Sequence, residues 1–137
     1  MSSPRAPRLS HLRQLPCALL ALWLAGPAHA QAGADCVPGG TVAQTNACAV
    51  KAFQQADTDN QILYGDVMRS LSAHERPELR REQSEWARQR GAQCKKAQAV
   101  HEALPEWPRL YHDCLTAATR QREAALKRWL HFGGPAQ

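Results

Sequence analysis

The chain has 137 residues, with 17 lysines and arginines against 12 aspartates and glutamates, which gives a formal net charge of +5. An aromatic content of 6% and a mean hydropathy of -0.50 do not suit a protein that crosses a membrane several times, and 44% hydrophobic residues is too many for a disordered chain. The composition therefore indicates one small globular domain.

The N-terminal stretch has the pattern of an export signal. Three arginines and no acid come before an apolar run over residues 15–25, and Ala28-His29-Ala30 has the small-x-small form that signal peptidase accepts. An apolar run of this length, at about 1.5 Å per residue, is too short to cross a hydrocarbon core about 30 Å thick. We therefore expect a signal peptide over residues 1–30, cleaved after Ala30, and a periplasmic or secreted domain over residues 31–137 without a transmembrane span.

The net charge of the chain falls once the signal is removed. Residues 1–30 hold three arginines and no acid, so the remaining 107 residues carry 14 basic and 12 acidic side chains. This balance gives little support to nucleic-acid binding. The bases gather late in the chain, at Arg120, Arg122, Lys127 and Arg128 among others. Two differently charged solvated faces explain that asymmetry, and a basic last helix that touches an anionic envelope surface is the alternative.

Three helical stretches follow one another along the mature chain. Either Thr41 or Thr45 can cap a first helix that runs to about Leu71, and Pro77 begins a second helix that runs to about Val100. A connector with two prolines leads to the third helix. The side chains expected to face the interior recur every three or four positions. They are Phe53, Ala56, Asn60, Tyr64, Val67 and Leu71 in the first helix, Leu79, Gln83, Trp86, Arg90, Cys94 and Ala97 in the second, and Leu110, Cys114, Ala118, Ala125, Trp129 and Phe132 in the third.

Short connections between three amphipathic helices predict an all-α fold, a small antiparallel three-helix bundle. In such a bundle, residues equally far from a turn in sequence lie at the same height. Asp57 and Arg90 are nearly equidistant from the first turn, centred near His74. Both charges lie on or beside apolar stripes, where an ion pair is tolerable and a lone ion is costly. We predict an Asp57–Arg90 ion pair inside the bundle or at its rim; projection of both side chains into water is the alternative.

The cysteine count supports export. The signal contains Cys17, and an even set of four remains: Cys36, Cys48, Cys94 and Cys114. In a short exported chain, four cysteines indicate two disulfides that staple the bundle. Cys94 and Cys114 lie equally far from the second connector, so we predict that they pair and leave Cys36 for Cys48. Pairing of Cys48 with Cys94 is further out of register, and it stays open.

Several of these residues resemble the LprI-like lysozyme-inhibitor family of small exported helical domains, and the resemblance spans residues 36–126. The matching residues are Asn46-Ala47-Cys48-Ala49, Phe53, Ala56-Asp57, Tyr64, the series Gln83, Trp86, Arg90 and Cys94, and finally Cys114-Leu115, Thr119, Arg122 and Leu126. Where the family usually has Leu-Asn, this chain has Asn60-Gln61, and it lacks the lipid attachment site of the founding member.

The resemblance implies a binding protein that protects the cell wall from lysozyme. The alternative is an envelope structural or interaction module that binds another envelope protein or an anionic surface. Asp57, Tyr64, Gln83, Trp86 and Arg90 form the family signature, and bundle packing explains them as well as a binding surface does. A lysozyme cleft carries two carboxylates. An inhibitor would block that cleft with a protruding loop or offer acids to the cationic surface around it. The candidate loop residues are Ser72, His74 and Glu75 in the turn, and His101, Glu102 and Glu106 in the connector.

No motif of a common enzyme class occurs in the chain. The sequence contains no nucleophile elbow, zinc-protease helix, phosphate loop or dinucleotide fingerprint. Asp57 with Asp59 and Glu82 with Glu85 are close pairs of carboxylates, which on amphipathic helices usually form a solvated face. His112 near Cys114 fits no zinc module, because no C-x-x-C pair accompanies it. We expect no enzymatic activity, no metal and no cofactor.

Overall fold

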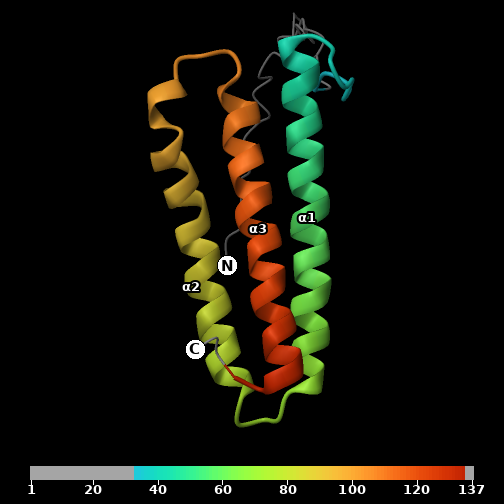
Figure 1. Cartoon of the computed structure of the whole chain (residues 1–137), viewed down its shortest axis with the longest axis vertical. Helices are drawn as coiled ribbons and strands as arrows, with labels where there is room; N and C mark the ends of the chain where they lie inside the picture. Colours follow the sequence, from blue (N-terminus) through green and yellow to red (C-terminus); the bar gives the residue numbers. More distant parts are fainter. Residues whose placement is uncertain (1–32, 135–137) are drawn as a thin grey trace, which may run out of the picture. The chain divides into compact units, whose positions relative to one another are not determined.

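The computed structural model describes residues 33–134, and it contains three long helices joined by short connections (Figure 1). Helix α1 spans Val42–Ser70, α2 spans Arg76–Ala97 and α3 spans Trp107–Phe132, with a single turn of 3-10 helix, η1, at Ala99–His101. No strand occurs among these residues. The predicted all-α, three-helix fold is confirmed, while the expected signal peptide and its cleavage site lie outside the described part of the chain.

Helix α1 begins at a reciprocal cap formed by Thr41, one of the two predicted candidates. The Thr41 Oγ1 accepts a hydrogen bond from the Gln44 backbone N–H at 3.3 Å, and the Gln44 Oε1 accepts one from the Thr41 N–H at 2.9 Å. This capping box satisfies two backbone donors that the first helical turn leaves unpaired. Thr45 lies inside the helix, where its hydroxyl donates to the Thr41 carbonyl at 3.2 Å.

Two helix boundaries differ from the sequence prediction. The second helix ends at Ala97 rather than near Val100, because Gln98 leaves helical geometry at φ -103 and ψ 10 and the chain tightens into η1. Pro108 lies in the first turn of α3 rather than in the connector. Proline is tolerated there because the backbone N–H that it lacks would have no partner inside the helix. At the other end of α3, Gly133 adopts the left-handed conformation at φ 60, which caps the helix.

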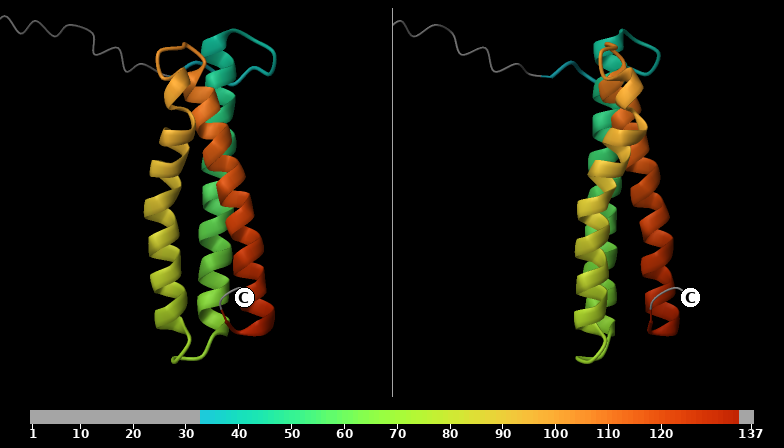
Figure 2. Two further views of the ribbon diagram at one scale, coloured as in Figure 1. Left: turned by 60° about the vertical axis from the view of Figure 1, so that its left-hand side comes forward. Right: turned by 90° about the vertical axis from the view of Figure 1, so that its left-hand side faces the viewer.

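The helices differ in how closely they approach one another. Helix α2 runs antiparallel to α1 and α3, which run in the same direction (Figures 1 and 2). Helices α1 and α3 pack closely, whereas α2 approaches them at fewer backbone positions. Buried Ala49, Ala56, Thr116 and Thr119 lie on the two closely packed helices, and small side chains allow helix axes to come near each other.

The largest buried apolar cluster lies near the turn between α1 and α2. This turn-end cluster consists of Val67, Leu71, Leu79, Leu126 and Trp129, and Leu63, Tyr64 and Met68 pack against it. Its members come from all three helices, so it closes the bundle at this end. The predicted interior face of α3 is wrong at Phe132, which is 82% exposed, and it omits the buried Leu115 and Leu126. The prediction for α3 followed apolar residues alone, whereas the buried face of this helix also contains the polar residues Thr119 and Arg122.

Both predicted disulfides are confirmed. Cys36 and Cys48 pair with their Cα atoms 4.4 Å apart, and Cys94 and Cys114 pair at 5.7 Å. The first bond ties the segment before α1 to the second turn of that helix, and the second bond links the end of α2 to the beginning of α3. Both therefore lie toward the end of the bundle that holds the connector, opposite the turn-end cluster.

Candidate functional site

Asp57 and Arg90 form the predicted ion pair at mid-height between α1 and α2. The Arg90 Nη1 donates to Asp57 Oδ1 at 2.6 Å and to Thr119 Oγ1 of α3 at 2.8 Å. The guanidinium also lies 4.6 Å from the ring centroid of Trp86 and 5.0 Å from that of Phe53. The Arg90 side chain is 14% exposed and that of Asp57 27%, so the pair lies at the rim of the bundle. One arginine therefore joins all three helices.

A second polar chain crosses the interior one turn nearer the turn-end cluster. Gln83 of α2 donates from Nε2 to the buried Asn60 of α1 at 3.1 Å and accepts at Oε1 from the Arg122 Nε at 2.8 Å. The Arg122 Nη1 donates to Glu82 Oε1, and Glu82 Oε2 accepts from the Trp129 indole N–H at 3.0 Å. Hydrogen bonds with charged partners are stronger than neutral ones, so this chain ties α2 to both other helices.

These two networks make up what we call the polar layer: Asp57, Asn60, Glu82, Gln83, Arg90, Thr119 and Arg122. Its two carboxylates are each held by an arginine. The neighbouring acids are held elsewhere: Asp59 accepts from Gln55 and Glu85 from Arg81. In each of the two pairs noted in the sequence, Asp57 with Asp59 and Glu82 with Glu85, the two carboxylates therefore bind different residues. The layer performs an architectural task, the docking of α2.

The signature residues of the sequence divide between two regions. Asp57, Gln83 and Arg90 belong to the polar layer, and Trp86 packs on its arginines. Tyr64 instead packs against the turn-end cluster. Sequence reasoning missed Glu82 as the partner of Arg122, and it placed Arg122 in an exposed basic patch. That placement is wrong, because Arg122 is only 6% exposed.

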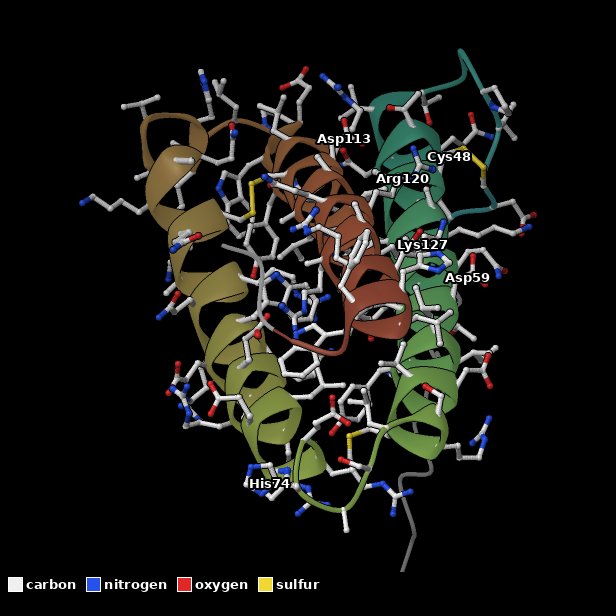
Figure 3. The ribbon with its side chains drawn as sticks, turned by 60° about the horizontal axis from the view of Figure 1, so that its bottom comes forward. Cys48, Asp59, His74, Asp113, Arg120 and Lys127 are labelled. Carbon is white, nitrogen blue, oxygen red and sulfur yellow. A yellow bond between two sulfur atoms is a disulfide. The ribbon has the colours of Figure 1, made fainter. Side chains whose placement is uncertain are left out.

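The candidate residues of the first turn form a small hydrogen-bonded unit. Glu75 Oε2 accepts one hydrogen bond from the Ser72 hydroxyl at 2.7 Å and another from the Ser72 backbone N–H at 3.0 Å. These bonds, first that from the hydroxyl and then that from the backbone, lower the pKa of Glu75 below its usual value. The Arg76 Nε donates to the Leu71 carbonyl at 3.0 Å. The exposed His74 lies at the end of this braced turn (Figure 3).

The candidate residues of the connector are arranged differently. Glu102 lies 3.9 Å from the Lys95 Nζ, and His101 and Glu106 are half-buried. Asn46 of α1 anchors this segment: its Nδ2 donates to the Pro105 carbonyl at 2.9 Å, and its Oδ1 accepts from the Arg109 N–H at 3.2 Å. The sequence indicated Asn46 only as the first residue of the run Asn46-Ala47-Cys48-Ala49, which resembles the family.

The turn and the connector lie at opposite ends of α2. That helix has 22 residues, so roughly 33 Å of helix separates the two candidate loops. The structure therefore does not bring Ser72, His74 and Glu75 together with His101, Glu102 and Glu106. A single narrow cleft on a partner can receive one of these loops but not both at once.

Residues 33–134 contain neither a cluster of metal ligands nor a helix suited to span a membrane. No group of three or more His, Cys, Asp or Glu side chains there is arranged to hold a metal ion. His112 and Cys114 each have another partner: Cys114 is bonded to Cys94, and His112 donates from Nδ1 to the Pro108 carbonyl at 2.6 Å. Among the same residues, no helix combines the length and the apolar character needed to cross a bilayer.

Fold and site together define a small, disulfide-stapled helical domain with a paired polar interior and two braced loops at opposite ends. The chain belongs to the LprI lysozyme-inhibitor family, whose model, described as "Lysozyme inhibitor LprI", matches residues 35–126. No curated protein and no solved structure matches the chain. The matched range begins just before Cys36 and ends at Leu126, so it includes both disulfides and the whole polar layer.

Proposed function

We propose that this protein is an exported, non-enzymatic inhibitor that binds lysozyme and so protects the cell wall. The observation that carries the proposal is the family match over residues 35–126. The two disulfides support export, because such bonds persist in oxidising compartments outside the cytoplasm. Residues 1–30 would then act as the signal peptide, with cleavage after Ala30 and a domain over residues 31–137.

The turn between α1 and α2 is the loop that we propose enters the lysozyme cleft. Its exposed His74 projects from a base that is already ordered by the Ser72–Glu75 hydrogen bonds. A loop that is rigid before binding loses less conformational entropy when it docks. Because a lysozyme cleft carries two carboxylates, an imidazole is a suitable hydrogen-bond donor to present there. The apolar turn-end cluster beneath the loop supports it against bending.

The connector is less suited to this role. Its two acids are less available to a partner, since Glu102 lies near the Lys95 ammonium and Glu106 is half-buried just before α3. The exposed side chains that remain there include Val100 and Leu104, which offer neither charge nor hydrogen bonds to a cleft lined by carboxylates. The connector therefore serves as the comparison loop for the proposal.

The proposal is tested by a lysozyme activity assay with the oxidised protein purified after export, against a goose-type and a chicken-type enzyme. Dose-dependent inhibition of either enzyme is expected, and it should be lost when both disulfides are reduced. Each bond closes a short loop and stabilises the domain by roughly 3 kcal/mol, so reduction unfolds much of this small bundle. Absence of inhibition at high molar excess, with helicity shown by circular dichroism, contradicts the proposal.

A further inference from the structure

A recess lies between α2 and α3, on the outer side of the polar layer. Its volume is about 300 Å³, and Trp86, Arg90 and Gln93 of α2 and Ala118, Gln121, Arg122, Ala125 and Arg128 of α3 line it. The two alanines leave open the space that larger residues would fill, and α2 is held away from α3 by its long side chains. The volume is within the range of small-ligand sites in proteins.

Three arginines converge on this recess. Arg90 and Arg122 are each paired with a carboxylate of the polar layer, Asp57 and Glu82, so those four charges balance. Arg128 is exposed and adds a positive charge at the rim. The recess is therefore cationic overall. Gln93 and Gln121 add neutral amide groups, which can donate hydrogen bonds to an oxygen-rich ligand.

One buried donor of Arg122, a residue of this wall, is unused. Within residues 33–134, the Nη2 of Arg122 is buried and has no hydrogen-bond partner, although Nε and Nη1 of the same guanidinium are engaged. A buried, unpaired donor on a charged group costs free energy, and such a group requires an explanation. Because Nη2 is closed to water in this conformation, a ligand oxygen in the recess would supply the missing acceptor after a small movement of the Arg122 side chain.

We propose that this recess binds a small oxyanion, either a carboxylate or a phosphate. The guanidinium of the exposed Arg128 is planar and presents parallel N–H donors, a geometry that matches both groups. The volume exceeds that of a bare phosphate, so a carboxylate carried on a sugar-sized polar body also fits, with its hydroxyls toward Gln93 and Gln121. This site is distinct from the proposed lysozyme-binding turn and does not depend on it.

Titration of the exported, oxidised protein followed by NMR tests the proposal directly. The probes are inorganic phosphate, glucuronate and neutral glucose, each at constant ionic strength with chloride as the balance. Saturable shifts of the Trp86 indole and Arg122 Nε–H resonances with phosphate or glucuronate support the site, and the tighter of the two anions identifies its source. The Trp107 indole, at the connector end, should stay unchanged. No saturable shift with either anion, or equal shifts with glucose, overturns the proposal.

Two matched pairs of variants separate the recess from general charge attraction. Ala125→Leu fills the recess without changing any charge and should weaken anion binding more than about tenfold, whereas Ala124→Leu, exposed on the same helix, should leave it unchanged. Arg128→Gln should weaken binding about fivefold. Arg120→Gln removes the same charge from a different hollow, one shared with Asp59, and should have no effect (Figure 3). Equal effects within either pair would mean that the recess is not the site.

Discussion

Two parts of α2, its beginning and its middle, are joined to the bundle by different physical means. Near the turn, Leu79 lies in the apolar cluster with Val67, Leu126 and Trp129. Along the middle of the helix, Gln83 and Arg90 replace apolar packing with hydrogen bonds to α1 and α3. Apolar packing closes the bundle, whereas the longer polar side chains hold α2 at a distance and leave a recess. The difference shows how one small domain keeps a rigid base and an open, polar flank.

The comparison predicts that the turn-end cluster contributes most to stability. Trp129→Ala should lower the free energy of unfolding by about 4 kcal/mol, because it leaves a large cavity and also removes the indole donor to Glu82. Urea denaturation followed by circular dichroism measures this loss. Phe132→Ala, three residues away on the exposed side of α3, should change stability by less than about 0.5 kcal/mol. Similar losses for the two variants would mean that the cluster is not the centre of stability.

Within the polar layer, Arg122 should matter most. Arg122→Met leaves Glu82 without its cation and Gln83 without its donor, and should cost about 3 kcal/mol. Adding Glu82→Gln removes the unpaired charge and should restore more than half of that loss, because an amide can still accept from Trp129. The same denaturation experiment applies. If the second substitution makes the protein less stable still, the cost does not come from an uncompensated carboxylate.

The Asp57–Arg90 pair is more exposed and should contribute less. A double-mutant cycle with Asp57→Asn and Arg90→Met should give a coupling free energy of about 1 kcal/mol, since water partly screens both side chains. Raising the salt concentration should reduce this coupling. A coupling indistinguishable from zero would show that the pair forms without stabilising the attachment of α2.

The smallest effect concerns the turn itself. The bonds to Ser72 lower the pKa of Glu75 in the folded protein. The stability contributed by Glu75 is therefore fully present above the pKa that Glu75 has in the unfolded chain, and it is lost as the pH falls through the pKa that Glu75 has in the folded protein. Ser72→Ala should return the pKa of Glu75 toward 4.5, which an NMR titration of the carboxyl resonance measures. A pKa unchanged in that variant would show that the turn is not braced by this bond.

The sequence was sufficient wherever local pattern or helix register decided the structure. Thr41 caps α1 because of its own side chain and that of Gln44, and the Asp57–Arg90 and Cys94–Cys114 pairs followed from equal distances to a connection. It was insufficient where a polar side chain is buried through partners on other helices. Arginine is usually exposed at the protein surface, and only the bonds of Arg122 to Glu82 and Gln83 make its interior position favourable.

The same reasoning explains the remaining differences. Phe132 was assigned to the interior for its apolar character, but the glycine cap at Gly133 ends α3 with that side chain in solvent. The recess was not predictable, because it depends on how far Trp86 and Arg90 hold α2 from the alanines of α3. Sequence patterns report which face is apolar, whereas the spacing between helices depends on the side chains that meet there.

The most direct test of the account is lysozyme inhibition by two variants that place the same residue at opposite ends of α2. His74→Glu puts a carboxylate at the end of the proposed inhibitory turn, and Val100→Glu puts one on the connector, where Val100 is 85% exposed. A carboxylate facing the cleft carboxylates is repelled, so the inhibition constant of His74→Glu should rise at least about tenfold while Val100→Glu inhibits like the parent protein. Loss of inhibition in Val100→Glu, with His74→Glu unaffected, would contradict the account and place the binding surface at the connector.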